Sequence, residues 1–160
     1  MSTVHFVDTS VLVELLNIPK MSQRHEIAKA EYQNLAMKQD TFVLPIAVLV
    51  ETGNHIGQIA DGAKRYEISN KFAQIVKKAI RSEDHWNVVP ELPASVLECM
   101  MDGFCDWTKT ASGFGDMSIV QQFEEYWQNR QPIGKMRIWS FDKHLSVYER
   151  EGGLARRRNK

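Results

Sequence analysis

The chain has 160 residues, of which 43% are hydrophobic and 25% charged, and its 20 basic residues balance its 20 acidic ones. This composition is typical of one soluble globular domain with a sizeable core. A neutral chain has no overall field to attract nucleic acid, so a polyanionic partner must be held by local basic patches or bound metal. The sequence has no signal-peptide pattern and no run long enough to cross a bilayer, so we expect a cytoplasmic protein with no membrane contact.

Apolar runs typical of strands alternate with helix-like segments through the first half of the chain. Strands are predicted over residues 4–8 and 41–44. Apolar residues three and four apart predict helices near residues 11–16, 28–36, 45–56 and 68–81. Pro45 suits the first turn of the third of these helices.

The second half continues the alternation. Strands are predicted over residues 86–90 and 136–141, helices after Pro93, from Asp116 and near residues 145–148, and a loop over residues 108–115. Strands alternating with helices predict an α/β, three-layer α/β/α fold with a central parallel sheet of four or five strands. We expect residues 1–150 to form a single domain and residues 151–160 a polar, basic C-terminal tail.

Four acidic residues are placed where such a sheet gathers side chains. Asp8 and Asp142 end predicted strands, Glu51 follows the second strand, and Asp116 opens a helix. The strand ends beside a switch in strand order share one crevice, and Asp8 is expected to be the most central. Clustered carboxylates are ligands for hard divalent cations, so the pattern predicts metal-dependent chemistry on phosphate.

Each acid also has a simpler interpretation. Asp8, Asp116 and Asp142 precede predicted helices, where an aspartate commonly caps the backbone N–H groups. Glu51 lies within an apolar helical run, where it is either buried with a partner or on the exposed stripe. The combination of the four is therefore more informative than any one.

Short motifs around these acids resemble one known family. They are Phe6-Val7-Asp8-Thr9-Ser10, Glu51, Asp116-Met117-Ser118-Ile119 and Ser140-Phe141-Asp142. From Val4 to Tyr148 the chain resembles the PIN-domain ribonucleases that serve as toxins of VapBC-type toxin–antitoxin pairs.

The resemblance implies a PIN-like fold and an endoribonuclease that cuts single-stranded or loop RNA. Asp8, Glu51, Asp116 and Asp142 would bind Mg²⁺ or Mn²⁺, and the hydroxyl residues Thr9, Ser10 and Ser140 would support the metal site. The family also implies an antitoxin protein, whose C-terminal segment blocks the acidic groove, and a homodimer.

The chain also departs from the family pattern. The stretch between Asp116 and Asp142 is longer than in compact members, and residues 82–115 match no family feature. Gln121, Gln122 and Glu124 replace small hydrophobic residues. These departures leave open the subfamily and the RNA that is cut.

Basic residues flank the acids in the sequence and are candidates for binding the RNA backbone, with a solvated surface as the alternative. They are Lys109, Lys135, Arg137 and Lys143. The five histidines are scattered and more typical of packed or solvated residues, although His55 lies one helical turn from Glu51 and would be able to orient it. Cys99 and Cys105 match no zinc pattern and are expected to be buried or half-buried thiols, and the Met100 to Phe104 region is a candidate apolar contact.

Three other classes of protein are alternatives to the nuclease. A metal-dependent binding module of the von Willebrand A type requires a hydroxyl where this chain has Leu12, and a haloacid dehalogenase-type phosphatase requires an aspartate where it has Ser10. A catalytically inactive PIN-like domain, which only binds nucleic acid or a partner, remains the main alternative. RNA cleavage with Mg²⁺, abolished by EDTA, would separate the nuclease from all three.

Overall fold

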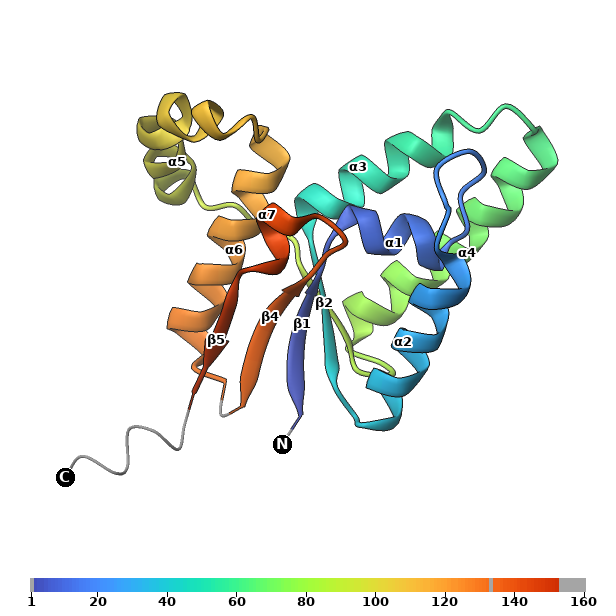
Figure 1. Cartoon of the computed structure of the whole chain (residues 1–160), viewed down its shortest axis with the longest axis horizontal. Coiled ribbons are helices and arrows are strands. Elements are labelled where there is room, and N and C mark those ends of the chain that lie inside the picture. The colour runs from blue at the N-terminus through green and yellow to red at the C-terminus, as the bar shows by residue number, and fades with distance from the viewer. Residues whose placement is uncertain (1, 133, 153–160) are drawn as a thin grey trace.

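The computed structural model describes residues 2–132 and 134–152 (Figure 1). In this part of the chain five strands form one sheet in the order β3-β2-β1-β4-β5. The strands are β1 Thr3–Val7, β2 Thr41–Pro45, β3 Trp86–Val89, β4 Lys135–Trp139 and β5 Glu149–Glu151. The first four run parallel, and β5 pairs antiparallel with β4.

Helices cover both faces of this sheet. Within the described residues they are α1 Thr9–Leu15, α2 His25–Met37, α3 Ile46–Gly57, α4 Gly62–Arg81, α5 Ala94–Trp107, α6 Phe114–Arg130 and α7 Lys143–Ser146, with a short 3₁₀ helix at Thr108–Thr110. The helices α2 and α4 lie against one face and α6 lies against the other (Figure 1). The predicted α/β class with helices on both sides of a central sheet is therefore confirmed.

The core forms because the central strands are apolar on both faces, as is usual where helices cover a parallel sheet. Phe6 and Phe42 are fully buried on opposite faces. The ring of Phe6 packs edge-on against Phe123 of α6, whereas Phe42 packs against Tyr32 of α2. The core thus anchors α2 and α6 on either side of β1 and β2.

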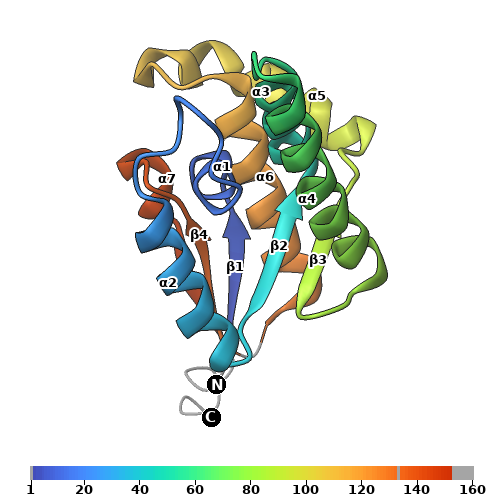
Figure 2. The same ribbon diagram turned by 90° about the vertical axis from the view of Figure 1, so that its right-hand side faces the viewer.

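The strand order places one switch point beside β1. From β1 the chain adds β2 and then β3 on one side, and β4 then pairs with the other side of β1. The helices α1, α3 and α7 begin directly beyond the carboxyl ends of β1, β2 and β4 (Figure 2). Side chains that follow these three strands are therefore brought to the same edge of the sheet.

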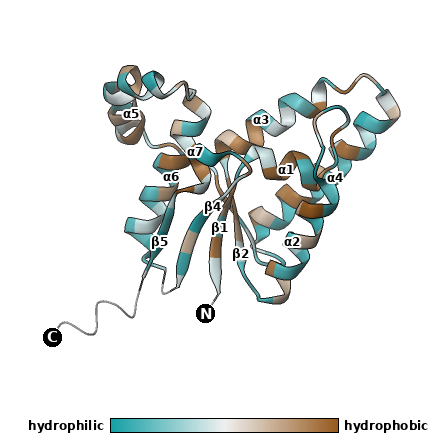
Figure 3. Ribbon diagram, viewed as in Figure 1, coloured by the Kyte–Doolittle hydropathy of each residue, from teal (hydrophilic) through white to brown (hydrophobic). Residues whose placement is uncertain are grey.

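The structure corrects some of the predicted element boundaries. Pro45 ends β2 and precedes α3 rather than lying in its first turn, and α6 begins at Phe114 within the predicted loop. The antiparallel strand β5 was not predicted, because Glu-Arg-Glu has no alternation of apolar and polar residues. Figure 3 shows β5 as hydrophilic throughout, as suits a short edge strand.

Two expectations concern the surroundings of the fold. Among the described residues, no helix is both long and apolar enough to pass through a membrane. The predicted basic tail falls largely at residues 153–160, outside the described residues.

Candidate metal centre

Asp8 lies at the carboxyl end of β1 and caps α1. Its Oδ2 accepts hydrogen bonds from Ser10 Oγ at 2.7 Å, Ser10 N at 3.3 Å and Ser140 Oγ at 2.8 Å. Within the described residues Oδ1 accepts none, so this oxygen keeps its lone pairs for another partner. The capping interpretation of Asp8 is therefore right, and it leaves one carboxylate oxygen available.

Ser140 connects Asp8 to Asp142. Its Oγ donates to Asp8 and accepts the backbone N–H of Asp142 at 2.9 Å. Asp142 in turn caps α7 by accepting the N–H of His144 at 2.8 Å. Because Ser10 Oγ accepts the N–H of Phe141 at 3.1 Å, the ends of β1 and β4 are locked together by side chains as well as by the sheet.

Thr9, the residue that follows Asp8, holds the side chain of Glu51 by a hydrogen bond. Thr9 Oγ1 donates to Glu51 Oε2 at 3.0 Å, and His55 Nε2 lies 3.8 Å from Glu51 Oε1. The Glu51 side chain is 49% exposed, so it does not incur the cost of burying a charge. His55 lies one helical turn from Glu51 as expected, but 3.8 Å is too long for a hydrogen bond, so Thr9 is the residue that orients Glu51.

Asp116 lies in the first turn of α6 and is not its cap, since Gly113 holds that position. Among the described residues its side chain makes no hydrogen bond. Asp116 and Glu51 line the same cavity of about 600 Å³, and a Cβ added at Gly115 would lie 3.7 Å from Glu51 Oε2. The first turn of α6 therefore lies close to Glu51, at a distance that a Cβ would also tolerate.

The charge of Asp116 is poorly compensated. Burial raises the pKa of Asp116, and the nearby charges of Asp8, Asp142 and Glu51 raise it further, in that order, while His144 opposes them. A carboxyl group responds in this way when it shares a site with like charges. The charges of Asp8, Glu51 and Asp142 are therefore near enough to Asp116 to affect its protonation.

The carboxylates do not form a closed cage in this structure. Within residues 2–132 and 134–152, no group of three or more His, Cys, Asp or Glu side chains is arranged so that it could hold a metal ion. Contacts with hydroxyl and backbone groups hold three of the acids, Asp8, Glu51 and Asp142. In chemical terms the donors fit Mg²⁺ or Mn²⁺, since all are carboxylate oxygens, and neither Asp8 Oδ1 nor the Asp116 carboxylate has a hydrogen-bond partner in the described part of the chain.

Three of the four predicted basic residues form ion pairs with carboxylates other than the four acids. Lys109 pairs with Asp106 at 2.6 Å, and Lys135 pairs with Glu149 at 2.7 Å. Lys135 begins β4 at the opposite end of the strand from Ser140, roughly 16 Å away at about 3.3 Å per residue. Lys143 follows Asp142 directly and is the one of the four that the structure places beside the acids.

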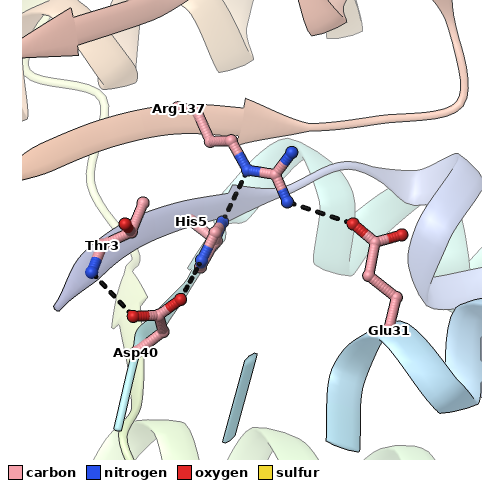
Figure 4. A network of polar contacts seen from close by, with 5 residues as sticks. All are labelled: Thr3, His5, Glu31, Asp40 and Arg137. Atoms are coloured by element: carbon pink, nitrogen blue, oxygen red, sulfur yellow. Dashed lines mark hydrogen bonds and ion pairs between the residues drawn. The ribbon is translucent and has the colours of Figure 1, made fainter. Parts of the chain in front are cut away.

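Arg137 belongs to a buried polar network at the amino end of the sheet (Figure 4). Its Nε donates to His5 Nδ1 at 2.9 Å, and its Nη2 donates to Glu31 Oε1 at 3.1 Å. His5 Nε2 donates to Asp40 Oδ2 at 2.9 Å, while Asp40 Oδ1 accepts the N–H of Thr3 at 2.8 Å. A guanidinium can only donate, so His5 Nδ1 carries no proton and the ring is neutral. Arg137 is thus used within the fold and does not point to the acidic edge.

Sequence reasoning missed this network. Burial lowers the pKa of His5 and so favours the neutral ring, although the hydrogen bond from its ring to Asp40 opposes that effect. The only signal was the pairing of His5 with Arg137 on adjacent strands, which becomes visible once the register of β1 and β4 is known.

The helix α5 also differs from expectation at its surface. Cys99 and Cys105 are exposed, not buried or half-buried as predicted. Met100 is buried and Met101 is 47% exposed, so the predicted apolar contact region is smaller than the sequence implied. Helix α5 packs against α6, and this contact determines which of its faces is covered.

Comparison with known proteins adds no relative. No protein-family model matches the chain, and no curated protein matches it. The likeness to PIN-domain ribonucleases therefore rests on the sequence motifs of this chain alone.

Proposed function

We propose that this protein is a Mg²⁺- or Mn²⁺-dependent endoribonuclease of the PIN-domain kind, the toxin of a type II toxin–antitoxin pair. The observation that supports this most strongly is that side-chain contacts relate three of the four acids, and the fourth shares a cavity with one of them. Ser140 links Asp8 to Asp142, and Thr9 holds Glu51 beside Asp8. Asp116 then shares a cavity with Glu51.

In this proposal the protein residues bind and orient. Ser10 and Ser140 both donate to one oxygen of Asp8, which fixes the plane of the carboxylate and leaves the other oxygen without a hydrogen bond among the described residues. Such hydroxyl partners commonly orient the ligands of a metal site. When bound, a divalent cation would activate water and neutralise the charge that develops on a phosphodiester during hydrolysis.

The uncompensated charge of Asp116 supports cation binding at the same place. Burial and then the charges of three carboxylates raise its pKa, so a positive ion nearby would relieve the part of this penalty that comes from like charges. Asp116 is therefore expected to contribute strongly to the affinity for the ion.

The partners in this proposal follow from the family resemblance. RNA is the substrate, an antitoxin protein covers the acidic groove through its C-terminal segment, and a second copy of the chain forms a homodimer. A cytoplasmic location belongs to the same proposal, because the substrate is cellular RNA. A short reading frame beside the gene, encoding a protein that binds this one, is the observation to seek for the toxin role.

Asp116→Asn gives a sharper test than a change at Asp8, which also caps α1 and binds Ser140. Asp116 is not a cap and makes no hydrogen bond with the described residues, so the amide should leave the fold intact. We expect Mg²⁺-dependent cleavage of mixed RNA to fall more than about 100-fold, because even partners of metal ligands typically account for 10–100-fold. The matched control is Asp102→Asn, which changes an exposed aspartate of α5 and should cleave normally.

The outcomes separate the proposed function from the alternative. Cleavage that needs Mg²⁺, stops with EDTA and is lost in Asp116→Asn supports the nuclease. Cleavage that persists in Asp116→Asn removes this residue from the site and with it the four-acid proposal. RNA binding without any cleavage by the parent protein would instead favour a catalytically inactive PIN-like domain.

A further inference from the structure

Arg24 places a positive charge over Phe141 at the acidic edge, although no pattern in the sequence marks it. The residue lies directly before α2, and its side chain is exposed. Its guanidinium carbon lies 5.2 Å from the centre of the Phe141 ring. Phe141 lies between Ser140 and Asp142, so the cation lies over the segment that contains two residues of the proposed metal site.

The backbone of Arg24 is held by Glu14, a buried acid that plays no part in the proposed site. Glu14 lies on α1, and its Oε2 accepts hydrogen bonds from Ser22 Oγ at 2.6 Å and from Arg24 N at 2.8 Å. The N–H of Gln23 also lies 3.1 Å from both of its carboxylate oxygens. The loop before α2 is therefore tied to α1, the helix that Asp8 caps, so the backbone from which the Arg24 side chain extends is already ordered before a ligand binds.

Arg24 also differs from most of the predicted basic residues in having no ion-pair partner. Lys109, Lys135 and Arg137 are each paired with a carboxylate. No carboxylate of the described part of the chain lies within ion-pair distance of the Arg24 guanidinium. The guanidinium lies over the Phe141 ring, and none of its N–H groups donates a hydrogen bond to the described residues, so these donors remain available.

We propose that Arg24 binds a backbone phosphate of the RNA strand, next to the phosphate held at the four acids. A guanidinium edge matches two phosphate oxygens, which suits a phosphodiester better than a lone ammonium would. A protein with no net charge needs such local cations to hold a polyanion. This inference rests on the proposed function and specifies how the strand is placed across the site.

The competing explanation is that Arg24 only supports Phe141 by stacking. The two explanations differ in the salt dependence of RNA binding, because a stacking residue releases no counterions when RNA binds. For single strands, log K falls with log salt by about 0.7 for each phosphate neutralised. A phosphate-binding residue therefore contributes to that slope, and a stacking residue does not.

The test measures binding of a labelled single-stranded RNA by fluorescence anisotropy between low and moderate salt. All variants carry Asp116→Asn, so that the RNA stays intact. We expect Arg24→Ala to weaken binding and lower the slope by about 0.7. Arg24→Lys should keep the slope and bind less tightly, because it keeps the charge and loses the paired donors.

Lys38→Ala is the matched control, since Lys38 is an exposed cation at the other end of α2, roughly 20 Å away at about 1.5 Å per residue. It should leave the slope unchanged. An Arg24→Ala slope equal to that of Lys38→Ala overturns the inference, and a simultaneous loss of urea stability would assign Arg24 the stacking role. If the parent protein neither binds nor cleaves RNA, the proposed function itself fails; RNA binding with an unchanged Arg24→Ala slope defeats only this inference.

Discussion

Ser140→Ala is the most informative single change, because Ser140 joins two of the four acids. The substitution removes the donor to Asp8 Oδ2 at 2.8 Å and the acceptor of the Asp142 N–H at 2.9 Å. The methyl group is smaller than the hydroxymethyl group and creates no clash. Any effect therefore reports the loss of these hydrogen bonds.

The magnitude follows from what each partner retains. A hydrogen bond to a charged group contributes about 1.5–3 kcal/mol net. Asp8 keeps Ser10 Oγ and Ser10 N as donors, so its charge is not left unpaired. Asp142 is exposed, so water can replace the lost acceptor. We therefore expect a loss of about 1.5–3 kcal/mol in the free energy of unfolding, or about 2–4 °C in Tm per kcal/mol for a domain of this size.

Urea unfolding and RNA cleavage measure the two consequences. The midpoint should fall without a change in m, because the folded state stays equally compact. Cleavage at saturating Mg²⁺ should fall about 10–100-fold, as for other residues that orient metal ligands. Ser146→Ala is the control, since Ser146 Oγ makes one exposed contact of 3.4 Å with the Lys143 carbonyl. Equal stability and activity in the two variants would refute the role assigned to Ser140.

Two further predictions concern protons. Burial and three neighbouring carboxylates raise the pKa of Asp116, so the folded protein holds this proton more tightly than the unfolded chain does. In EDTA at neutral pH, Asp116→Asn should therefore be more stable to urea than the parent protein. The difference in stability should vanish below pH 3.8, the ordinary pKa of this group. A less stable variant would contradict the shared-charge interpretation. Burial lowers the pKa of His5, so the unfolded chain takes up a proton on this ring at a higher pH than the folded protein does. The neutral ring of His5 should therefore contribute stability above its ordinary pKa of 6.5, and this contribution should decline as the pH falls below that value. Unfolding measured between pH 8 and 5 should show this decline, and His5→Gln should lack it; equal pH dependence in both proteins would rule out His5 as its source.

Much of the fold could be predicted because its signals are local. Apolar runs and helical spacing depend on neighbouring residues, and they indicated the four parallel strands and most helices. The three acids at the predicted starts of helices also follow a local rule, and Asp8 and Asp142 do cap their helices. Strand β5 escaped prediction because a three-residue polar edge strand has no such pattern.

The surroundings of the acids were decided by contacts between distant parts of the chain. The register of β1 and β4 sets His5 opposite Arg137, which takes that arginine out of the candidate RNA-binding set. Packing of the loop before α2 against Phe141 brings Arg24 beside the acidic edge, although no pattern in the sequence marks it. Residue types and spacing define which helices and strands form, because those depend on near neighbours. Which cations approach the carboxylates depends on how these elements pack, and therefore only the folded chain reveals it.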